Sequence, residues 1–493
     1  MYDYIVIGGG ISGLSISNRL ENTKILLIEK NDYLGGRIKT VKLGENNIEA
    51  GAARFNSNHK LLIKLLKEFK LFKDIIKISN NKTYFNLDLE KCPKNIVEIV
   101  VKELSKFTDK ELLNNTIISL CKKIFDKTFV KCFTDSFFYY SEIHKCNAFD
   151  ALRSLKYDLN ENKQFYILKG GMTRLIDSIE KKIKLYTDII KNTFVVNIEY
   201  VNKQFLVYTK GNEDRVYEGK KLIVASGKSS MTKIPFFKKI SKNLNSIELI
   251  PLVRIYAVYP KINGKVWFDG LTKVITKAPI KFIIPISYDK GIIMISYVDG
   301  KYSNHWKKHQ LEGTLEKEVN KEVSKIFTDR KIPKPKKIKA YFWNEGISVW
   351  KPGYKSKIIF KKMIKPMRIP LFVCGENFSI NNGWIEGSLD TANRVFKKIN
   401  KSQKRSQKAG SDKKTKKWKK YTLDEVKKHN TESDAWTVIN DKVLNITEWV
   451  PKHPGGKIIR NGFGINATEM FKFHNHSTQA KEKLNDFQIG ILI

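Results

Sequence analysis

A glycine-rich turn near the start of the chain is the first pattern with a chemical meaning. Gly8, Gly10 and Gly13 fit GxGxxG; an expected strand over 2–7 precedes them, and a helix to about residue 20 follows. Gly8 allows a tight turn, Gly10 lets the backbone approach a pyrophosphate, and Gly13 permits close packing of helix on strand. The helix N-terminus would direct free N–H groups at the phosphates. The pattern predicts a dinucleotide site.

Glu29 supplies an acid at the end of a second expected strand, over 24–29. A carboxylate at this distance from the glycines accepts hydrogen bonds from ribose hydroxyls, so it favours FAD or NAD over NADP. A glycine-rich turn beside a solvated glutamate is the alternative. The order of strand, glycines, helix, strand and acid favours the dinucleotide site.

Further motifs distinguish FAD from NAD. Gly-Gly-Arg, Glu-Ala-Gly-Ala-Ala-Arg-Phe, Gly-Gly-Met, Gly-Glu-Asn and Gly-Trp-Ile-Glu-Gly-Ser occur in this order at 35–37, 49–55, 170–172, 375–377 and 383–388. With these motifs, residues 1–400 resemble the flavin-containing amine oxidases, which include monoamine, polyamine and L-amino-acid oxidases. The resemblance implies FAD as the cofactor.

The resemblance also implies a set of FAD contacts. Arg37 would balance pyrophosphate or flavin charge, and Glu376 would accept hydrogen bonds from the ribityl chain or a ribose. Trp384 would lie near the flavin face, and the helix after it would direct its N-terminus at the pyrimidine side of the ring. The other expected contacts are Gly36, Ala53, Val195, Gly375 and Ile385.

Three further positions bear on the chemistry that the resemblance implies. Some members tether flavin through a cysteine, but Cys374 lies within an expected strand, so we expect non-covalent FAD. Arg254 stands where many members place a lysine near flavin N5; it would be a fixed cation, which puts lysine-assisted reaction with oxygen in doubt. Arg54 would anchor a substrate carboxylate. The alternative for Arg254 is an ordinary strand arginine. The alternative for Arg54 is a structural ion pair within the fold. Arg54, Arg254 and Trp384 are the expected catalytic residues.

Residues 421–493 carry a second set of motifs. Expected strands over 434–440 and 443–447 precede a His-Pro-Gly-Gly turn at 453–456, and a His-Ser pair follows at 476–477. This domain resembles cytochrome b5 over its whole length. The resemblance implies a bound heme b and a small α+β fold.

His453 and His476 are the expected axial ligands of the heme iron. Two neutral imidazoles that face each other would fill both axial positions, and such iron carries single electrons. His474 is a competing ligand, but the serine after His476 and its distance from Phe471 favour His476. A zinc site and a heme-free structural fold are the alternatives, although no cysteine lies nearby and the spacing fits no common zinc pattern.

Composition limits the partners. The 91 Lys and Arg residues exceed the 50 Asp and Glu residues, which gives a formal net charge of +41. The lysines are scattered, which favours a diffuse bias; weak binding to anionic surfaces is the alternative, and no nucleic-acid motif is present. Five scattered cysteines without a CxxC pair argue against a disulfide framework. We expect no signal peptide, no transmembrane segment and a cytoplasmic location.

These patterns require two folded domains. We expect an α/β fold with a Rossmann-like FAD-binding domain and a mixed α+β substrate domain over 1–400, a basic flexible linker over 401–420, and the heme domain over 421–493. The FAD-binding parts are expected at about 1–60, 165–240 and 360–400, and the substrate parts at about 61–164 and 241–359.

The leading hypothesis is an FAD-dependent oxidoreductase that takes a hydride from an amine or amino acid and exchanges electrons through the fused heme, in either direction. An external electron donor or acceptor protein is a further expected partner. The first alternative is a desaturase or oxidase of a hydrophobic substrate. The second is a non-catalytic scaffold in which FAD is structural.

Overall fold

A computed structural model describes residues 1–493 apart from 79–83, 87–91, 138, 159–163, 212–213, 277–278, 412–417, 475, 478–479 and 481–482. The chain divides into two compact units, Met1–Ile399 and Asn400–Ile493. The strands of each unit pair among themselves, and each unit has apolar cores of its own. The two units are therefore described separately.

The first unit contains a seven-stranded sheet in the order β10-β11-β12-β1-β2-β9, with β18 also paired to β12. Strands β1, β2, β9, β12 and β18 run parallel, whereas β10, β11 and β12 form an antiparallel extension. The strands are β1 (Tyr2–Ile7), β2 (Ile25–Ile28), β9 (Thr187–Ile190), β10 (Phe194–Val201), β11 (Gln204–Lys210), β12 (Arg215–Val224) and β18 (Leu371–Val373).

Both faces of this sheet are covered, as parallel strands with uninterrupted apolar runs require. On β1, Tyr4 and Val6 point into one core, and Ile5 and Ile7 point into another. The first core is shared with helices α1 (Ile11–Arg19), α2 (Lys60–Glu68), α9 (Thr173–Ile183) and α15 (Ile385–Ser411). The second is shared with α10 (Lys228–Lys233), η3 (Pro235–Ile240), α11 (Ser241–Leu244) and α14 (Ser356–Met363).

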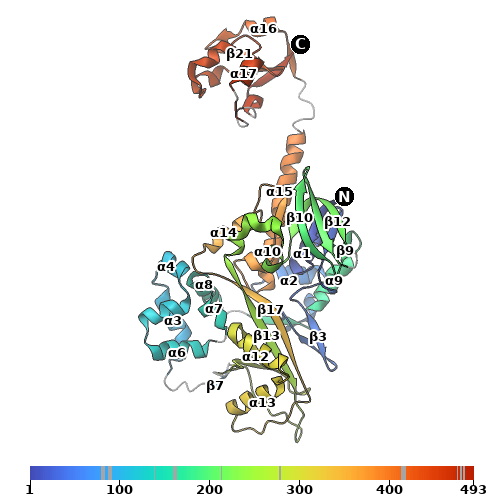
Figure 1. Ribbon diagram of the computed structural model, residues 1–493, viewed down its shortest axis with the longest axis vertical. Helices are drawn as coiled ribbons and strands as arrows, with labels where there is room; N and C mark the ends of the chain where they lie inside the picture. Colours follow the sequence, from blue (N-terminus) through green and yellow to red (C-terminus); the bar gives the residue numbers. More distant parts are fainter. Residues whose placement is uncertain are drawn as a thin grey trace. The chain divides into compact units, whose positions relative to one another are not determined.

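A six-stranded sheet in the order β17-β13-β16-β15-β14-β7 forms the other half of the first unit. Its strands are β7 (Tyr84–Asn86), β13 (Ile247–Val258), β14 (Val274–Thr276), β15 (Phe282–Ser287), β16 (Ile292–Asp299) and β17 (Lys337–Trp350). The long strands β13 and β17 run side by side, and helices α12 (Gly300–Leu311) and α13 (Leu315–Ile326) share a core with this sheet (Figure 1).

A helical layer of the first unit has an apolar core of its own. Its helices are α3 (Ile96–Leu104), α4 (Asp109–Asn114), α5 (Ile117–Ile124), α6 (Lys127–Ser136), α7 (Tyr140–His144) and α8 (Ala148–Asp158). Smaller strands complete the unit: β3 (Thr40–Leu43) with β4 (Asn46–Glu49), and β5 (Phe55–Asn56) and β6 (Ile75–Lys77) on either side of β8 (Phe165–Leu168).

The second unit has a five-stranded sheet in the order β19-β23-β22-β21-β20. Its strands are β19 (Lys419–Tyr421), β20 (Asn430–Thr431), β21 (Asp434–Ile439), β22 (Lys442–Asn445) and β23 (Gln488–Leu492). Helix α16 (Leu423–Lys427) begins with a capping box from Thr422 to Glu425. Turns η5 (Thr447–Lys452) and η6 (Gly456–Gly462) and helix α17 (Thr468–Phe473) pack beside the sheet.

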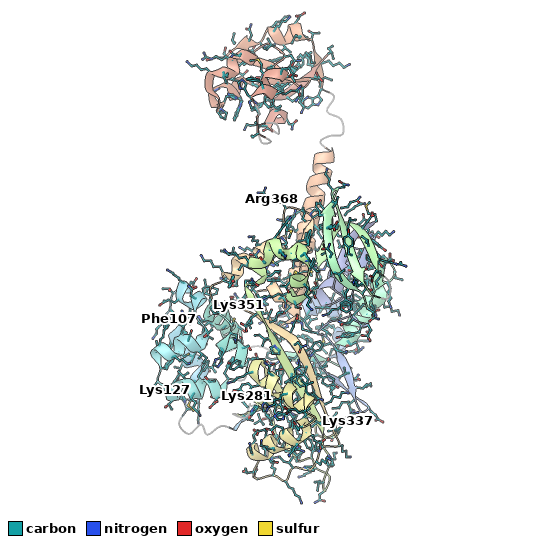
Figure 2. All side chains as sticks on the ribbon, in the orientation of Figure 1. Phe107, Lys127, Lys281, Lys337, Lys351 and Arg368 are labelled. Atoms are coloured by element: carbon teal, nitrogen blue, oxygen red, sulfur yellow. A yellow bond between two sulfur atoms is a disulfide. The ribbon has the colours of Figure 1, made fainter. Side chains whose placement is uncertain are left out.

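Most basic side chains lie on the outside of the first unit. Lys127, Lys337, Lys351 and Arg368, labelled in Figure 2, lie on separate parts of it. Lys281 is an exception, because it is only 1% exposed and its Nζ donates to the carbonyls of Thr134, Asp135 and Phe137 near the end of α6. Burial lowers its pKa to about 8.

The α/β fold and the small separate C-terminal domain are confirmed. Two local expectations are wrong. Helix α15 continues to Ser411, so the first half of the expected linker is helical: a formed helix extends without a new nucleus through residues such as Lys, Gln and Ala that favour it. Cys92 and Cys132 form a disulfide across the helical layer, although their spacing gave no sign of it.

No helix among the described residues is long and apolar enough to cross a membrane.

Candidate functional site

A single cavity of about 1090 Å³ collects nearly all the expected flavin-site residues of the first unit. It extends from the glycine turn after β1, past the ends of β2 and β18, to the long strands β13 and β17. Ligands bind at this edge of open parallel sheets, beyond the carboxyl ends of the strands. The expected residues that line it are Gly8, Gly10, Glu29, Gly36, Arg37, Ala53, Arg54, Val195, Arg254, Gly375, Glu376, Trp384 and Ile385.

The three fingerprint glycines have three different surroundings. Gly8 has φ +106°, and a Cβ there would lie 2.9 Å from the carbonyl carbon of Ala225. A Cβ at Gly13 would lie 2.0 Å from the oxygen of Gly8, so Gly13 serves packing and does not line the cavity. A Cβ at Gly10 meets no described atom within 4 Å, so Gly10 opens onto the cavity at the start of α1. This arrangement fits a pyrophosphate at the helix N-terminus.

Glu29 is held in place by the turn that it faces. Its Oε2 accepts a hydrogen bond from Gly9 N at 2.7 Å, and its Oε1 accepts from Asn31 N and Nδ2. The side chain is only 5% exposed and lines the cavity. An acid fixed at this point fits the ribose hydroxyls of FAD.

The half-buried side chain of Arg37 pairs with the buried carboxylate of Glu376 on the cavity wall, with Arg37 Nη2 at 2.9 Å from Glu376 Oε2. Glu376 also accepts hydrogen bonds from Ser348 and from Gly383 N. Burial alone would raise the pKa of the Glu376 carboxyl, but Arg37 and these donors outweigh it and hold the pKa below its usual value. Glu376 therefore joins β17 and the turn before α15 as well as facing the cavity.

Arg54 and Trp384 bring aromatic surface to the same cavity. The guanidinium of Arg54 lies 5.2 Å from the ring centre of Phe165, and its Nη2 donates to Tyr139 Oη at 3.3 Å. Trp384 contacts His59 edge-on at 4.8 Å between ring centres. Among the described residues, no carboxylate forms an ion pair with Arg54, so its charge is available to a ligand.

Arg254 is a buried cation on β13, with 8% of its surface exposed. Nη1 donates to the carbonyl of Glu49 at 3.0 Å, and the guanidinium lies 4.7 Å from the ring centre of Tyr297. Nε is buried and has no hydrogen-bond partner among the described residues. Burial alone would lower the pKa of Arg254, but the electron-rich oxygens of Tyr256 and Tyr297 outweigh it and keep the pKa above its usual value.

Cys374 lies in the apolar core beside β18, 4% exposed. It is absent from the described lining of the cavity, and burial raises its thiol pKa to about 12. A thiolate that could attack a flavin is thus disfavoured here.

In the second unit, the rings of His453 and His476 lie opposite each other. Their ring centres lie 6.4 Å apart, which matches two imidazoles that each bind a shared metal at about 2 Å. His476 Nδ1 lies 2.9 Å from the carbonyl of Phe471, which fixes its tautomer if Nδ1 donates and leaves Nε2 for iron. Nδ1 of His453 is buried without a hydrogen-bond partner among the described residues.

The surroundings of the two histidines suit a heme. A Cβ at Gly455 would lie 2.8 Å from His453 Cε1, so the turn after His453 needs glycine. His474 is exposed and its ring stands at 88° to that of His476, which leaves His476 as the ring that faces His453. The apolar core of the second unit is covered by partly buried apolar side chains, those of Trp449, Val450, Ile459, Phe463, Phe471, Leu484 and Phe487.

Sequence reasoning missed several cavity residues. His59, Tyr139, Arg153, Tyr297 and Trp343 line the cavity but belong to no motif that was recognised. They come from a loop, the helical layer and the six-stranded sheet, and only the fold brings them together. The sole sequence signal for these residues would have been aromatic side chains at alternate positions of β16 or β17. Such patterns are usual in sheets, so they do not indicate a site.

Comparison with known proteins decides the family of the first unit. The family model described as "Flavin containing amine oxidoreductase" matches residues 11–400. The chain belongs to the flavin-containing amine oxidoreductase family. It is therefore a flavin-dependent oxidoreductase, and its expected flavin cofactor is confirmed.

Solved structures share the fold of the first unit. A redesigned putrescine oxidase double mutant superposes with a TM-score of 0.66 at 15% identity, over 81% of this chain and 98% of that chain. A candidate protoporphyrinogen oxidase from Exiguobacterium superposes with a TM-score of 0.61 at 13% identity, over 80% of this chain and 98% of that one.

The second unit matches the family model "Cytochrome b5-like Heme/Steroid binding domain" over residues 422–493, which confirms the heme domain. A cytochrome b5 of Rhizopus stolonifer is 47% identical over 73 residues, 15% of this chain and 56% of that protein. An acyl-lipid (8-3)-desaturase of Physcomitrium patens is 41% identical over 75 residues, 15% of each chain. The chain thus spans about half or less of these relatives, and the desaturase shares the heme domain alone.

Proposed function

We propose that the protein oxidises an amine or an amino acid at FAD in the first unit and exchanges the electrons with the heme of the second. The observation that carries this proposal is the cavity itself. One continuous space joins the glycine turn and Glu29, which suit the dinucleotide, to an end lined by Arg54, Arg254 and Trp384. A substrate there would lie next to the ring system of the cofactor.

The residues at this end of the cavity favour a substrate that carries a carboxylate and can pack against aromatic side chains. Arg54 lies beside Phe165 and Tyr139 and can offer two parallel N–H donors to a carboxylate. Trp384 and His59 supply a wall of aromatic edges and faces. An α-amino acid, with a carboxylate for Arg54 and a C–H bond beside its amine, fits these groups better than a plain amine.

Arg254 favours electron exchange with the heme over a lysine-assisted reaction of the flavin with oxygen. Bound flavin accepts a hydride and can release electrons one at a time, so it links two-electron substrates with a one-electron heme. The neighbours of Arg254 keep its guanidinium charged, so this residue can stabilise negative charge but cannot shuttle a proton as a lysine could. An external redox protein would complete the route at the heme.

The test is anaerobic reduction of the holoprotein with a panel of L-amino acids, amines and lipophilic substrates. We expect flavin absorbance to bleach with amino acids, and Arg54→Gln to raise the KM for amino acids at least a hundredfold while amines, which lack the carboxylate, serve as the internal control. Equal losses for both substrate classes would reject the carboxylate role. Bleaching by lipophilic substrates alone would reject amine oxidation.

A further inference from the structure

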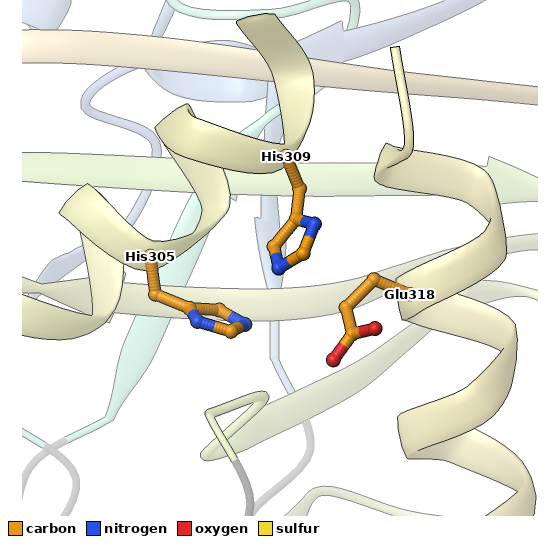
Figure 3. Close-up of side chains that lie close together, drawn as sticks. All are labelled: His305, His309 and Glu318. Atoms are coloured by element: carbon orange, nitrogen blue, oxygen red, sulfur yellow. The ribbon is translucent and has the colours of Figure 1, made fainter. Parts of the chain in front are cut away.

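Two histidines and one glutamate lie together at a point of the first unit that is separate from the flavin cavity. His305 and His309 are on α12, and Glu318 is on α13. One ligand atom from each side chain lies within 4.8 Å of the other two. Figure 3 shows both rings and the carboxylate directed into the same space between the helices. We propose that this cluster is a binding site for a divalent transition metal, with Zn²⁺ as its cation.

The spacing along α12 explains why the two rings meet. Residues four apart lie on the same face of a helix, one turn above the other. The ring centres of His305 and His309 lie 4.8 Å apart. Trp306, between them in sequence, is fully buried and donates from Nε1 to the carbonyl of Pro279, so it anchors α12 and fixes the face that the histidines present.

The hydrogen bonding of the His305 and His309 rings leaves one nitrogen of each ring able to bind a metal. Nε2 of His305 is buried without a hydrogen-bond partner among the described residues, an arrangement that is costly unless a ligand occupies the space. His309 Nδ1 lies 2.8 Å from Thr314 Oγ1, and donation by Nδ1–H would leave Nε2 as the ligand atom.

The ligand types favour zinc over magnesium or calcium. Two imidazoles and one carboxylate form a known zinc donor set, and they leave a fourth position for water. Mg²⁺ and Ca²⁺ prefer sites made of oxygen alone. Lys321 competes for Glu318, since its Nζ lies 3.1 and 3.2 Å from the two carboxylate oxygens. Its side chain is 54% exposed and can turn into water when a cation replaces it.

A metal here would join α12 to α13. Both helices contribute to one apolar core, through Trp306 on α12 and Leu315, Val319 and Val323 on α13. A ligand that binds only the folded state raises the stability of that state as its concentration exceeds its Kd. Zinc should therefore stabilise this part of the molecule as well as occupy it.

The experiment uses the full-length, untagged protein with FAD and heme bound, freed of loose metal with a chelator. Titration calorimetry with ZnCl₂ and the zinc content after gel filtration are measured for the wild type, His309→Gln and Glu318→Gln. Glu316→Gln is the matched control, because Glu316 lies on the same helix and pairs with Lys334 outside the cluster. Unchanged flavin and heme absorbance checks that each variant is folded.

We expect one zinc per chain in the wild type and in Glu316→Gln, with at least a tenfold increase in Kd for His309→Gln and Glu318→Gln. X-ray absorption at the zinc edge should show imidazole ligands, and their signal should weaken in His309→Gln. Equal zinc affinity in all four proteins would overturn the proposal, and so would a wild type that retains no zinc. Neither result depends on the substrate of the flavin site.

Discussion

The flavin cavity of the first unit and the facing histidine pair of the second unit are assembled in opposite ways. Both histidines that face each other in the second unit come from one short segment, on either side of η6 and α17. The flavin cavity instead joins residues from Gly8 to Ile385, placed at the ends of strands that are far apart in sequence. Removing one histidine should therefore abolish heme binding, whereas each single substitution in the flavin cavity should weaken FAD binding only in part.

The largest expected effect is loss of heme from a single substitution. His453→Ala or His476→Ala should lower the heme content at least tenfold, because the iron would lose one of the two axial ligands proposed for it. The Soret absorbance relative to flavin measures this, and the flavin content should not change. His474→Ala is the control and should keep its heme. Full heme retention in His453→Ala would contradict the local account of this site.

The glycine turn offers a matched pair of substitutions. Gly13→Ala should destabilise the first unit by about 2 to 3 kcal/mol, because its Cβ would lie 2.0 Å from the oxygen of Gly8. Gly10→Ala should leave the stability of the FAD-free protein within about 0.5 kcal/mol, since its Cβ meets no described atom, yet weaken FAD binding at least tenfold. Chemical unfolding and FAD titration separate the two. The same effect for both variants would contradict the assignment.

The stability of the first unit should depend on pH through one buried carboxyl group, that of Asp299. Burial raises the pKa of Asp299 to about 6, above its ordinary 3.8, and Ser141 N donates to its carboxylate at 3.1 Å. The folded state therefore holds this proton more tightly than the unfolded state, and the stabilisation is complete below pH 3.8 and lost as pH rises through 6.

Asp299→Asn should remove this dependence. Relative to the wild type, the variant should gain stability between pH 4 and pH 7, by on the order of 2 to 3 kcal/mol. Thermal unfolding of the first unit, followed by flavin release, measures the gain. Asp289→Asn is the control, because the Asp289 side chain is 99% exposed. A variant whose stability difference stays constant across this range would show that Asp299 does not titrate as described.

The smallest expected effect concerns one member of the distributed site. Glu376→Gln should weaken FAD binding by roughly tenfold, about 1.4 kcal/mol, because Arg37 loses its partner but remains one-third exposed to water. Asp390→Asn, on the same helix as Ile385 and paired outside the cavity with Arg394, should bind FAD normally. Complete loss of FAD in Glu376→Gln would mean that the site is less distributed than its geometry indicates.

Local signals predicted much of the fold and site. Short-range patterns predicted the strand at 2–7, the glycine turn and Glu29, and the structure retains all three. The strand expected over 371–374 forms over Leu371–Val373. The pair His453 and His476 was predicted through the resemblance to cytochrome b5, and the two rings lie opposite each other. The roles of the individual flavin-site residues stay predictions, although their common cavity agrees with them.

Long-range contacts were not predictable in the same way. The ion pair of Arg37 with Glu376 and the disulfide of Cys92 with Cys132 depend on how distant segments pack, which no local periodicity specifies. The helical residues after 400 were missed for a different reason. Their composition is polar, and helix propagation from the folded part of α15 outweighs the lack of apolar surface.

The central claim is that flavin and heme exchange electrons within one chain. Anaerobic stopped-flow mixing of the holoprotein with a reducing amino acid tests it directly, with flavin and Soret absorbance followed together at several protein concentrations. We predict that flavin bleaches first and that the heme is then reduced at a rate independent of protein concentration. A heme that stays oxidised while flavin bleaches, or whose reduction rate rises in proportion to protein concentration, would contradict the claim.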